Sequence, residues 1–68
     1  MTAVARVSKI TAASSKGFQH AVETAVKRAS KTVRGITGVE VIEQKAKVAN
    51  GKISEYRATV EITFILEG

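Results

Sequence analysis

The dipeptide Asn50-Gly51 constrains the fold of this sequence more than any other feature. Asn-Gly is the pair most compatible with positive φ at both central positions of a two-residue β-hairpin turn. The residues before it, 39–49, read V-E-V-I-E-Q-K-A-K-V-A and are typical of a strand. The turn therefore predicts that this strand pairs antiparallel with the residues that follow Gly51.

The strand after the turn alternates between apolar and polar residues. One set is apolar and consists of Tyr56, Ala58, Val60, Ile62, Phe64 and Leu66. The other set consists of Glu55, Arg57, Thr59, Glu61, Thr63 and Glu67. Because successive side chains of a strand point to opposite faces, the pattern predicts one core face and one polar face. Roughly 15 residues would span about 50 Å, which is more than a small domain can cover, so we expect the overhang to pair or pack with a neighbour.

A strand and a helix precede the hairpin. Residues 4–11, V-A-R-V-S-K-I-T, are rich in β-branched types and predict the strand. Ser14 or Ser15 could cap the first turn of a helix, and Gly35 is placed to end it. Between them, apolar residues recur at three- and four-residue steps, which predicts a helix about five turns long. The stripe consists of Phe18, Ala21, Val22, Ala25, Val26, Ala29, Val33 and Ile36.

The order strand, helix, strand, strand predicts a single α+β domain over residues 1–68. A right-handed crossover through the helix would run the first strand in the direction of the second. Since the second and third strands pair through the tight turn, the simplest sheet has the third strand in the middle.

A chain of 68 residues has a core whose burial stabilises it by about as much as chain ordering costs. The sequence has no cysteine and one histidine, which excludes disulfides, a cysteine-bound zinc and a histidine-rich metal site. Oligomerisation is the remaining common means of stabilisation. We find no apolar run long enough for a signal peptide or a membrane span, and we expect a cytoplasmic protein.

The sequence offers no catalytic constellation. The only histidine, His20, is expected on the helix surface or its boundary, and no glycine-rich phosphate loop precedes the helix. The net charge of +5 favours polyanionic partners, and a basic cluster lies near the helix end: Lys27, Arg28, Lys31 and Arg34. Compensation of the helix dipole explains this cluster. Nucleic-acid binding is the alternative, but it would rest on electrostatics alone because Phe18, Tyr56 and Phe64 occupy predicted core positions.

Three segments of the sequence are similar to those of the dodecins, in order and without gaps from Val4 to Glu67. They include R-A-S-K-T at residues 28–32, E-V at 40–41 and T-F-I-L-E at 63–67. The resemblance implies a β-α-β-β subunit whose three-stranded antiparallel-type sheet wraps around one helix. It also implies a homo-oligomer of twelve subunits that forms a hollow shell. Dodecins bind flavins such as riboflavin or FMN in stacked pairs near two-fold axes, for storage or quenching, without chemical turnover.

Two family site positions differ in this sequence. The flavin-stacking Trp of the family corresponds to Gly38, and its isoalloxazine-binding Gln corresponds to Arg57. Loss of the aromatic platform predicts that flavin binding is weak or lost, by about 10- to 100-fold for each stacked ring. Arg57 could bind a phosphate or carboxylate or stack on a planar ring, or it could serve as a cross-strand partner for a Glu.

The sequence more closely resembles the dodecins that lack this Trp, for which metal cations have been proposed as ligands. Glu43 occupies a position where some dodecins have an acidic residue near a divalent cation such as calcium or magnesium. The alternative is an exposed carboxylate paired with Lys45 or Arg57. Coenzyme A has also been seen with family members. The sequence thus predicts a non-catalytic binding or storage protein of the dodecin type, with a flavin-storing dodecin that uses Arg57, or a basic nucleic-acid-associated protein, as alternatives.

Overall fold

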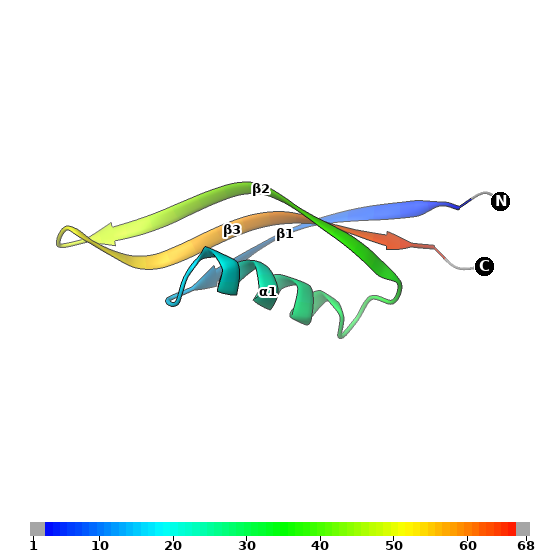
Figure 1. Cartoon of the computed structure of the whole chain (residues 1–68), viewed down its shortest axis with the longest axis horizontal. Helices are drawn as coiled ribbons and strands as arrows, with labels where there is room; N and C mark the ends of the chain where they lie inside the picture. The colour runs from blue at the N-terminus through cyan, green and yellow to red at the C-terminus, as the bar shows by residue number, and fades with distance from the viewer. Residues whose placement is uncertain (1–2, 67–68) are drawn as a thin grey trace.

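The computed structural model describes residues 3–66 and has the predicted order of elements. The elements are β1 (Ala5–Ser14), α1 (Phe18–Ala29), β2 (Ile36–Ala49) and β3 (Lys52–Ile65). The sheet order is β1-β3-β2, and β3 is antiparallel to both neighbours, which confirms that the third strand lies in the middle. The helix lies against one face of the sheet, and the β2–β3 hairpin extends beyond it (Figure 1). The predicted polar position Glu67 lies outside the described residues.

The hairpin turn forms at the predicted dipeptide. Asn50 has φ 54° and Gly51 has φ 74°, the positive values that this type of turn requires. Ala49 and Lys52 are paired on either side of it. The turn therefore fixes the register of the two longest strands from their closed end.

The helix is shorter than predicted, because it ends at Ala29 after 12 residues rather than near Gly35. As the chain leaves the helix, two successive backbone N–H groups donate to the carbonyl oxygen three residues earlier. The N–H of Lys31 donates to Arg28 O at 3.2 Å, and that of Thr32 donates to Ala29 O at 3.1 Å. These tighter bonds end the α-helix in a single turn. Ile36, placed on the helical stripe by its spacing, instead begins β2 opposite Phe64. The helical spacing of apolar residues thus continues past the end of the helix, through a turn and into β2. Only the pairing of Ile36 with β3 shows that this residue belongs to a strand and not to the helix.

The start of the helix also differs from the prediction. Gly17 occupies the N-cap position, and no side chain caps the first turn. Ser14 is the last residue of β1, where it is 8% exposed. Its Oγ accepts a hydrogen bond from the Lys16 N–H at 2.9 Å and lies 2.6 Å from Nδ1 of His20, which is exposed. Ser14 thus ties the end of β1 to the first helical turn through the ring of His20.

The core lies between the helix and the central strand. Its buried residues are Ala21, Ala25, Ala58, Val60 and Ile62. Three of these five are alanines, whose small side chains let a helix pack close to a sheet. Tyr56 is half-buried against Phe18, with ring centroids 5.0 Å apart in an edge-to-face arrangement. Leu66, predicted on the core face, follows the last residue of β3 and is 47% exposed.

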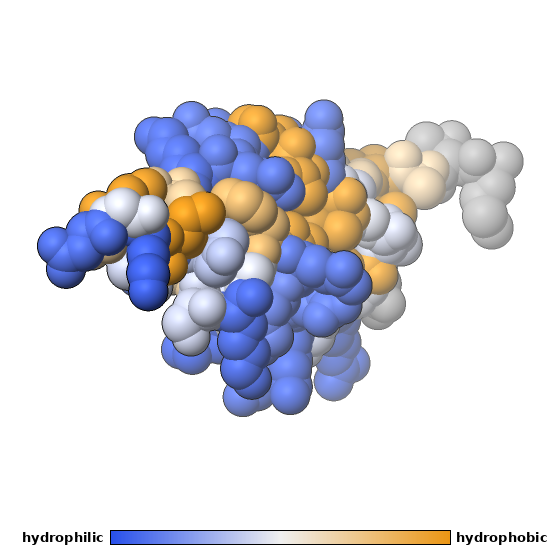
Figure 2. Space-filling view, turned by 60° about the vertical axis from the view of Figure 1, so that its left-hand side comes forward, coloured by the Kyte–Doolittle hydropathy of each residue, from blue (hydrophilic) through white to orange (hydrophobic). Residues whose placement is uncertain are grey.

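The chain has the shape of an elongated sheet rather than a compact domain. Its extents are 54 × 20 × 13 Å, and its radius of gyration is 14.1 Å where about 11 Å is usual for this length. The accessible surface is 5207 Å², against about 4,100 Å² for a monomeric protein of this mass. Figure 2 shows hydrophobic surface lying between hydrophilic areas. The large exposed apolar residues are Val4, Val7, Val39, Val41, Ile42, Val48, Ile53 and Leu66.

Within residues 3–66, no helix is long and apolar enough to span a membrane.

The exit from the helix region makes Gly35 sensitive to substitution. Gly35 has φ 75°, and a Cβ there would lie 3.1 Å from the carbonyl oxygen of Ile65. We expect Gly35→Ala to lower the free energy of unfolding by about 1 to 3 kcal/mol, measured by thermal unfolding with circular dichroism. Gly51→Ala is the matched control, since Gly51 has φ 74° and no atom within 4 Å of such a Cβ. Equal losses in both variants would show that the approach to Ile65 contributes nothing.

Candidate ligand-binding site

The face of the sheet that points away from the helix is predominantly polar. Because Ala58, Val60 and Ile62 of β3 face the helix, Arg57 and Thr59, which alternate with them, face the other side. We call this side the open face. The register places four residues of β2 there, paired as follows: Glu40 with Glu61, Glu43 with Thr59, Lys45 with Arg57 and Lys47 with Glu55.

A β-bulge in β2 decides which of these residues share the open face. The register shifts between Val41 and Glu43, so that Ile42 is an extra residue without a partner on β3. Glu40 and Glu43 are three positions apart and would point to opposite faces of a regular strand. The bulge brings both to the open face. The only sequence signal is the pair Val41-Ile42, which interrupts the alternation of apolar and polar residues.

Side chains from all three strands surround a hollow of about 190 Å³ on the open face. Its lining residues are Thr11, Glu43, Lys45, Arg57 and Thr59. The hydroxyl oxygens of Thr11 and Thr59 lie 2.9 Å apart across the β1–β3 pair. Two of the residues named from the sequence, Glu43 and Arg57, thus meet in one pocket. Thr59 was named only as a polar residue of its strand, and Thr11 was missed because it reaches this place only through the register between β1 and β3.

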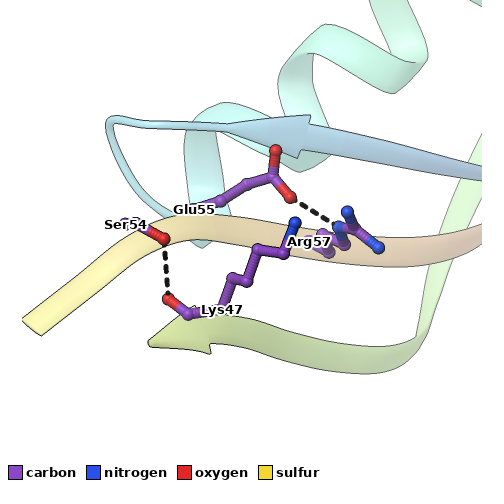
Figure 3. Close-up of polar contacts among 4 residues, drawn as sticks. All are labelled: Lys47, Ser54, Glu55 and Arg57. Atoms are coloured by element: carbon purple, nitrogen blue, oxygen red, sulfur yellow. Dashed lines mark hydrogen bonds and ion pairs between the residues drawn. The ribbon is translucent and has the colours of Figure 1, made fainter. Parts of the chain in front are cut away.

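Arg57 pairs with a carboxylate of its own strand. Its Nε donates to Oε2 of Glu55 at 2.6 Å, with the Glu55 side chain 33% exposed and that of Arg57 50% exposed. Lys47, opposite Glu55 on β2, extends toward this pair, and its carbonyl oxygen accepts a hydrogen bond from Ser54 at 3.2 Å (Figure 3). The predicted Glu partner is therefore present, but it lies two residues earlier on β3 rather than across the sheet. Because the pair is half-exposed, its contribution to stability is about 0 to 1 kcal/mol.

Glu43 lies beside positive rather than negative groups. Its Oε1 is 3.6 Å from Nζ of Lys45, and both side chains are more than half exposed. Among residues 3–66, no three His, Cys, Asp or Glu side chains gather closely enough to hold a metal ion.

Gly38 shares the open face with Arg57 but lies far from it. Gly38 is paired with Thr63, six residues along β3 from Arg57, or about 20 Å. One chain therefore does not bring together the two positions that the family resemblance names. A Cβ at Gly38 would meet only the Cβ of Thr63, at an ordinary 3.9 Å. The backbone there does not require glycine, and a Cβ is accommodated without a clash.

A helix packed on one face of a three-stranded antiparallel sheet, with a charged pocket on the other face, defines a small α+β domain. Residues 4–67 match the dodecin family, and the chain belongs to it. A comparison with curated protein sequences finds no match.

Solved dodecin structures agree closely with this fold. A mutant of the Thermus thermophilus dodecin has 28% identity over 98% of this chain and 100% of its own, with a TM-score of 0.93. The dodecin from Streptomyces coelicolor has 29% identity over 97% of this chain and 94% of its own, with a TM-score of 0.91. A calcium-chelating immunodominant antigen of Mycobacterium tuberculosis, a calcium dodecin, has 35% identity over 94% of this chain and 91% of its own, with a TM-score of 0.81.

Proposed function

We propose that this protein is a non-catalytic binding and storage protein whose single-domain subunits assemble into a hollow shell of twelve. The observation that carries the proposal is the separation of Gly38 and Arg57 on the open face of one subunit. A family ligand site built from both positions is complete only when subunits meet. Native mass spectrometry of the purified protein tests this directly, since twelve copies of 7.2 kDa give about 86 kDa plus the mass of any co-purified ligand.

The surface of the subunit supports assembly. It exceeds the surface usual for a monomer of this mass by roughly a quarter. Within residues 3–66, eight large apolar residues are exposed, and they are spread over β1, β2 and β3 and the residues at the sheet ends. Burial of such residues at about 25 cal/mol per Å² would add the stabilisation that a core of five buried residues lacks.

Flavin binding is proposed to be weak. Gly38 provides no ring on which an isoalloxazine could stack, and the guanidinium of Arg57 is already engaged by Glu55. The alternative of a flavin-storing dodecin that uses Arg57 requires this half-exposed ion pair to rearrange, so that the planar guanidinium lies on the flavin. That rearrangement costs little, so fluorescence titration with riboflavin and FMN decides between the two.

A second candidate ligand is a divalent cation such as calcium or magnesium. The Mycobacterium tuberculosis relative is a calcium-chelating dodecin, and Glu43 is the proposed ligand here. In a symmetric shell, copies of Glu43 from two or three subunits could converge at an axis, although the neighbouring Lys45 would have to turn away from the bound ion. We also infer that the protein acts in the cytoplasm and does not bind nucleic acid.

Calcium is expected to stabilise the protein through Glu43. At a free calcium concentration ten times its dissociation constant, binding would raise the free energy of unfolding by about 1.4 kcal/mol per site. Thermal unfolding with calcium chloride or with a chelator measures this difference. Glu43→Gln should remove it, whereas Glu40→Gln, an exposed change on the same face of β2, should keep it. A calcium effect that survives in Glu43→Gln would contradict the assignment.

A further inference from the structure

A second hollow lies on the helix side of the sheet, at the C-terminal end of α1. Its volume is about 210 Å³. The apolar lining residues are Ile10, Ala29, Val33 and Ile62, and the polar ones are Ser8, Arg28 and Thr32. This hollow is separated by the sheet from the charged pocket of Glu43 and Arg57.

The hollow exists because the helix ends where its facing residues are small. Ala29 is the last residue of α1, and the chain then turns away through residues 30–35 toward β2. On the sheet below, Ser8 of β1 is paired with Ile62 of β3. The small side chains of Ala29 and Ser8 thus leave space that two larger side chains would fill. An apolar cavity of about 150 Å³ accommodates benzene, so this one has room for an aromatic ring or a short aliphatic chain.

The polar groups of the hollow favour an anion. No acidic residue lines it, and Arg28 has no ion-pair partner among residues 3–66. Lys27 and Lys31 line a neighbouring hollow together with Arg28, which makes the local potential positive. The hydroxyl of Thr32 is only weakly engaged, at 3.5 Å from the carbonyl oxygen of Ala29. Arg28 is thus available to bind a carboxylate, which a guanidinium can do through two parallel hydrogen bonds.

We propose that this hollow binds a small amphiphilic carboxylate, an aromatic or short-chain acid. The apolar part of the acid lies against Ile10, Ile62 and Val33, and its carboxylate is bound by Arg28 with a hydrogen bond from Thr32. Mostly apolar lining with a few convergent polar groups is the usual composition of a small-molecule site. This site goes beyond the proposed storage function, since it uses none of Gly38, Glu43 and Arg57.

The test is a titration of the purified, assembled protein with 4-fluorobenzoate, followed by fluorine NMR. Saturable binding is expected with a dissociation constant on the order of 1 mM, as suits a ligand of about ten heavy atoms. Arg28→Gln should weaken it about tenfold through loss of the charged hydrogen bonds. Lys27→Gln is the matched control, because it removes the same charge one residue away from the hollow, and it should change the affinity less than about twofold.

Two further measurements separate the site from non-specific attraction and from the open face. Ala29→Leu, which fills the hollow with a side chain that helices favour, should abolish binding, and 4-fluorobenzyl alcohol should bind more weakly than the acid. Arg57→Gln should leave the binding of 4-fluorobenzoate unchanged, whatever it does to flavins or cations. Absence of saturable binding to the assembled protein would overturn the proposal. Equal losses in Arg28→Gln and Lys27→Gln would also overturn it.

Discussion

Replacement of Ile53 by Glu is expected to abolish the assembly of subunits into the shell. Ile53 is 49% exposed and lies opposite Val48, which is 64% exposed, on the part of the hairpin that extends past the helix. If this arm packs against a neighbour, the variant loses about 1.5 to 3 kcal/mol of apolar burial and places a charge in the contact. The loss recurs in every subunit of the shell. Native mass spectrometry should therefore show species far below about 86 kDa.

Thr24→Glu is the matched control for this variant. It introduces the same side chain at an exposed position on α1, away from the arm. The shell should persist in this variant if the arm is the contact. A full-size assembly of Ile53→Glu would contradict the proposal that the arm packs against a neighbour, and a wild-type mass near one or two subunits would contradict the shell itself.

The hairpin and the central strand could be predicted from the sequence because their signals are local. Asn50-Gly51 fixes two positive φ values, and the alternation of β3 fixes which residues face the helix. The central position of β3 followed from a tight turn and a right-handed crossover. The excess length of β3 could also be predicted from the sequence. In the structure it corresponds to the part of the β2–β3 hairpin that extends past the helix.

The end of the helix and the bulge in β2 could not be predicted, because both depend on pairing between distant residues. Val33 and Ile36 continue the spacing of a helix, but Ile36 gains a partner on β3 instead. The bulge at Ile42 determines that Glu43 shares a face with Glu40, and regular alternation would have separated them.

The sequence named Glu43 and Arg57 for two separate sites, a cation site and a flavin site. In the structure both residues, from neighbouring strands, line one pocket. The partner of Arg57 was found only in the structure, because Glu55 lies on the same strand, on the same face. The distance between Gly38 and Arg57 was equally hidden, since resemblance to a family assigns positions to a ligand without stating which subunit contributes each one.

The combination of Gly38→Trp and Arg57→Gln is expected to create strong flavin binding. By the family resemblance, Trp and Gln are the flavin-site residues at these two positions, and a stacked ring contributes about 1 to 3 kcal/mol, or about 10- to 100-fold in affinity for each ring. Because a flavin near a two-fold axis would contact a Trp from each of two subunits, the combined gain is on the order of 100-fold or more. Quenching of riboflavin and FMN fluorescence in a titration measures it.

The structure permits this gain because Gly38 is not required by the backbone. A Cβ there meets only the Cβ of Thr63 at 3.9 Å, and Gly38 is not among the glycines with positive φ. Gly38→Leu in place of Gly38→Trp is the matched control, since it adds apolar bulk without a π face and should leave the flavin fluorescence nearly unquenched. Strong quenching by the wild-type protein at micromolar concentration would instead show that Arg57 already supplies the stacking surface.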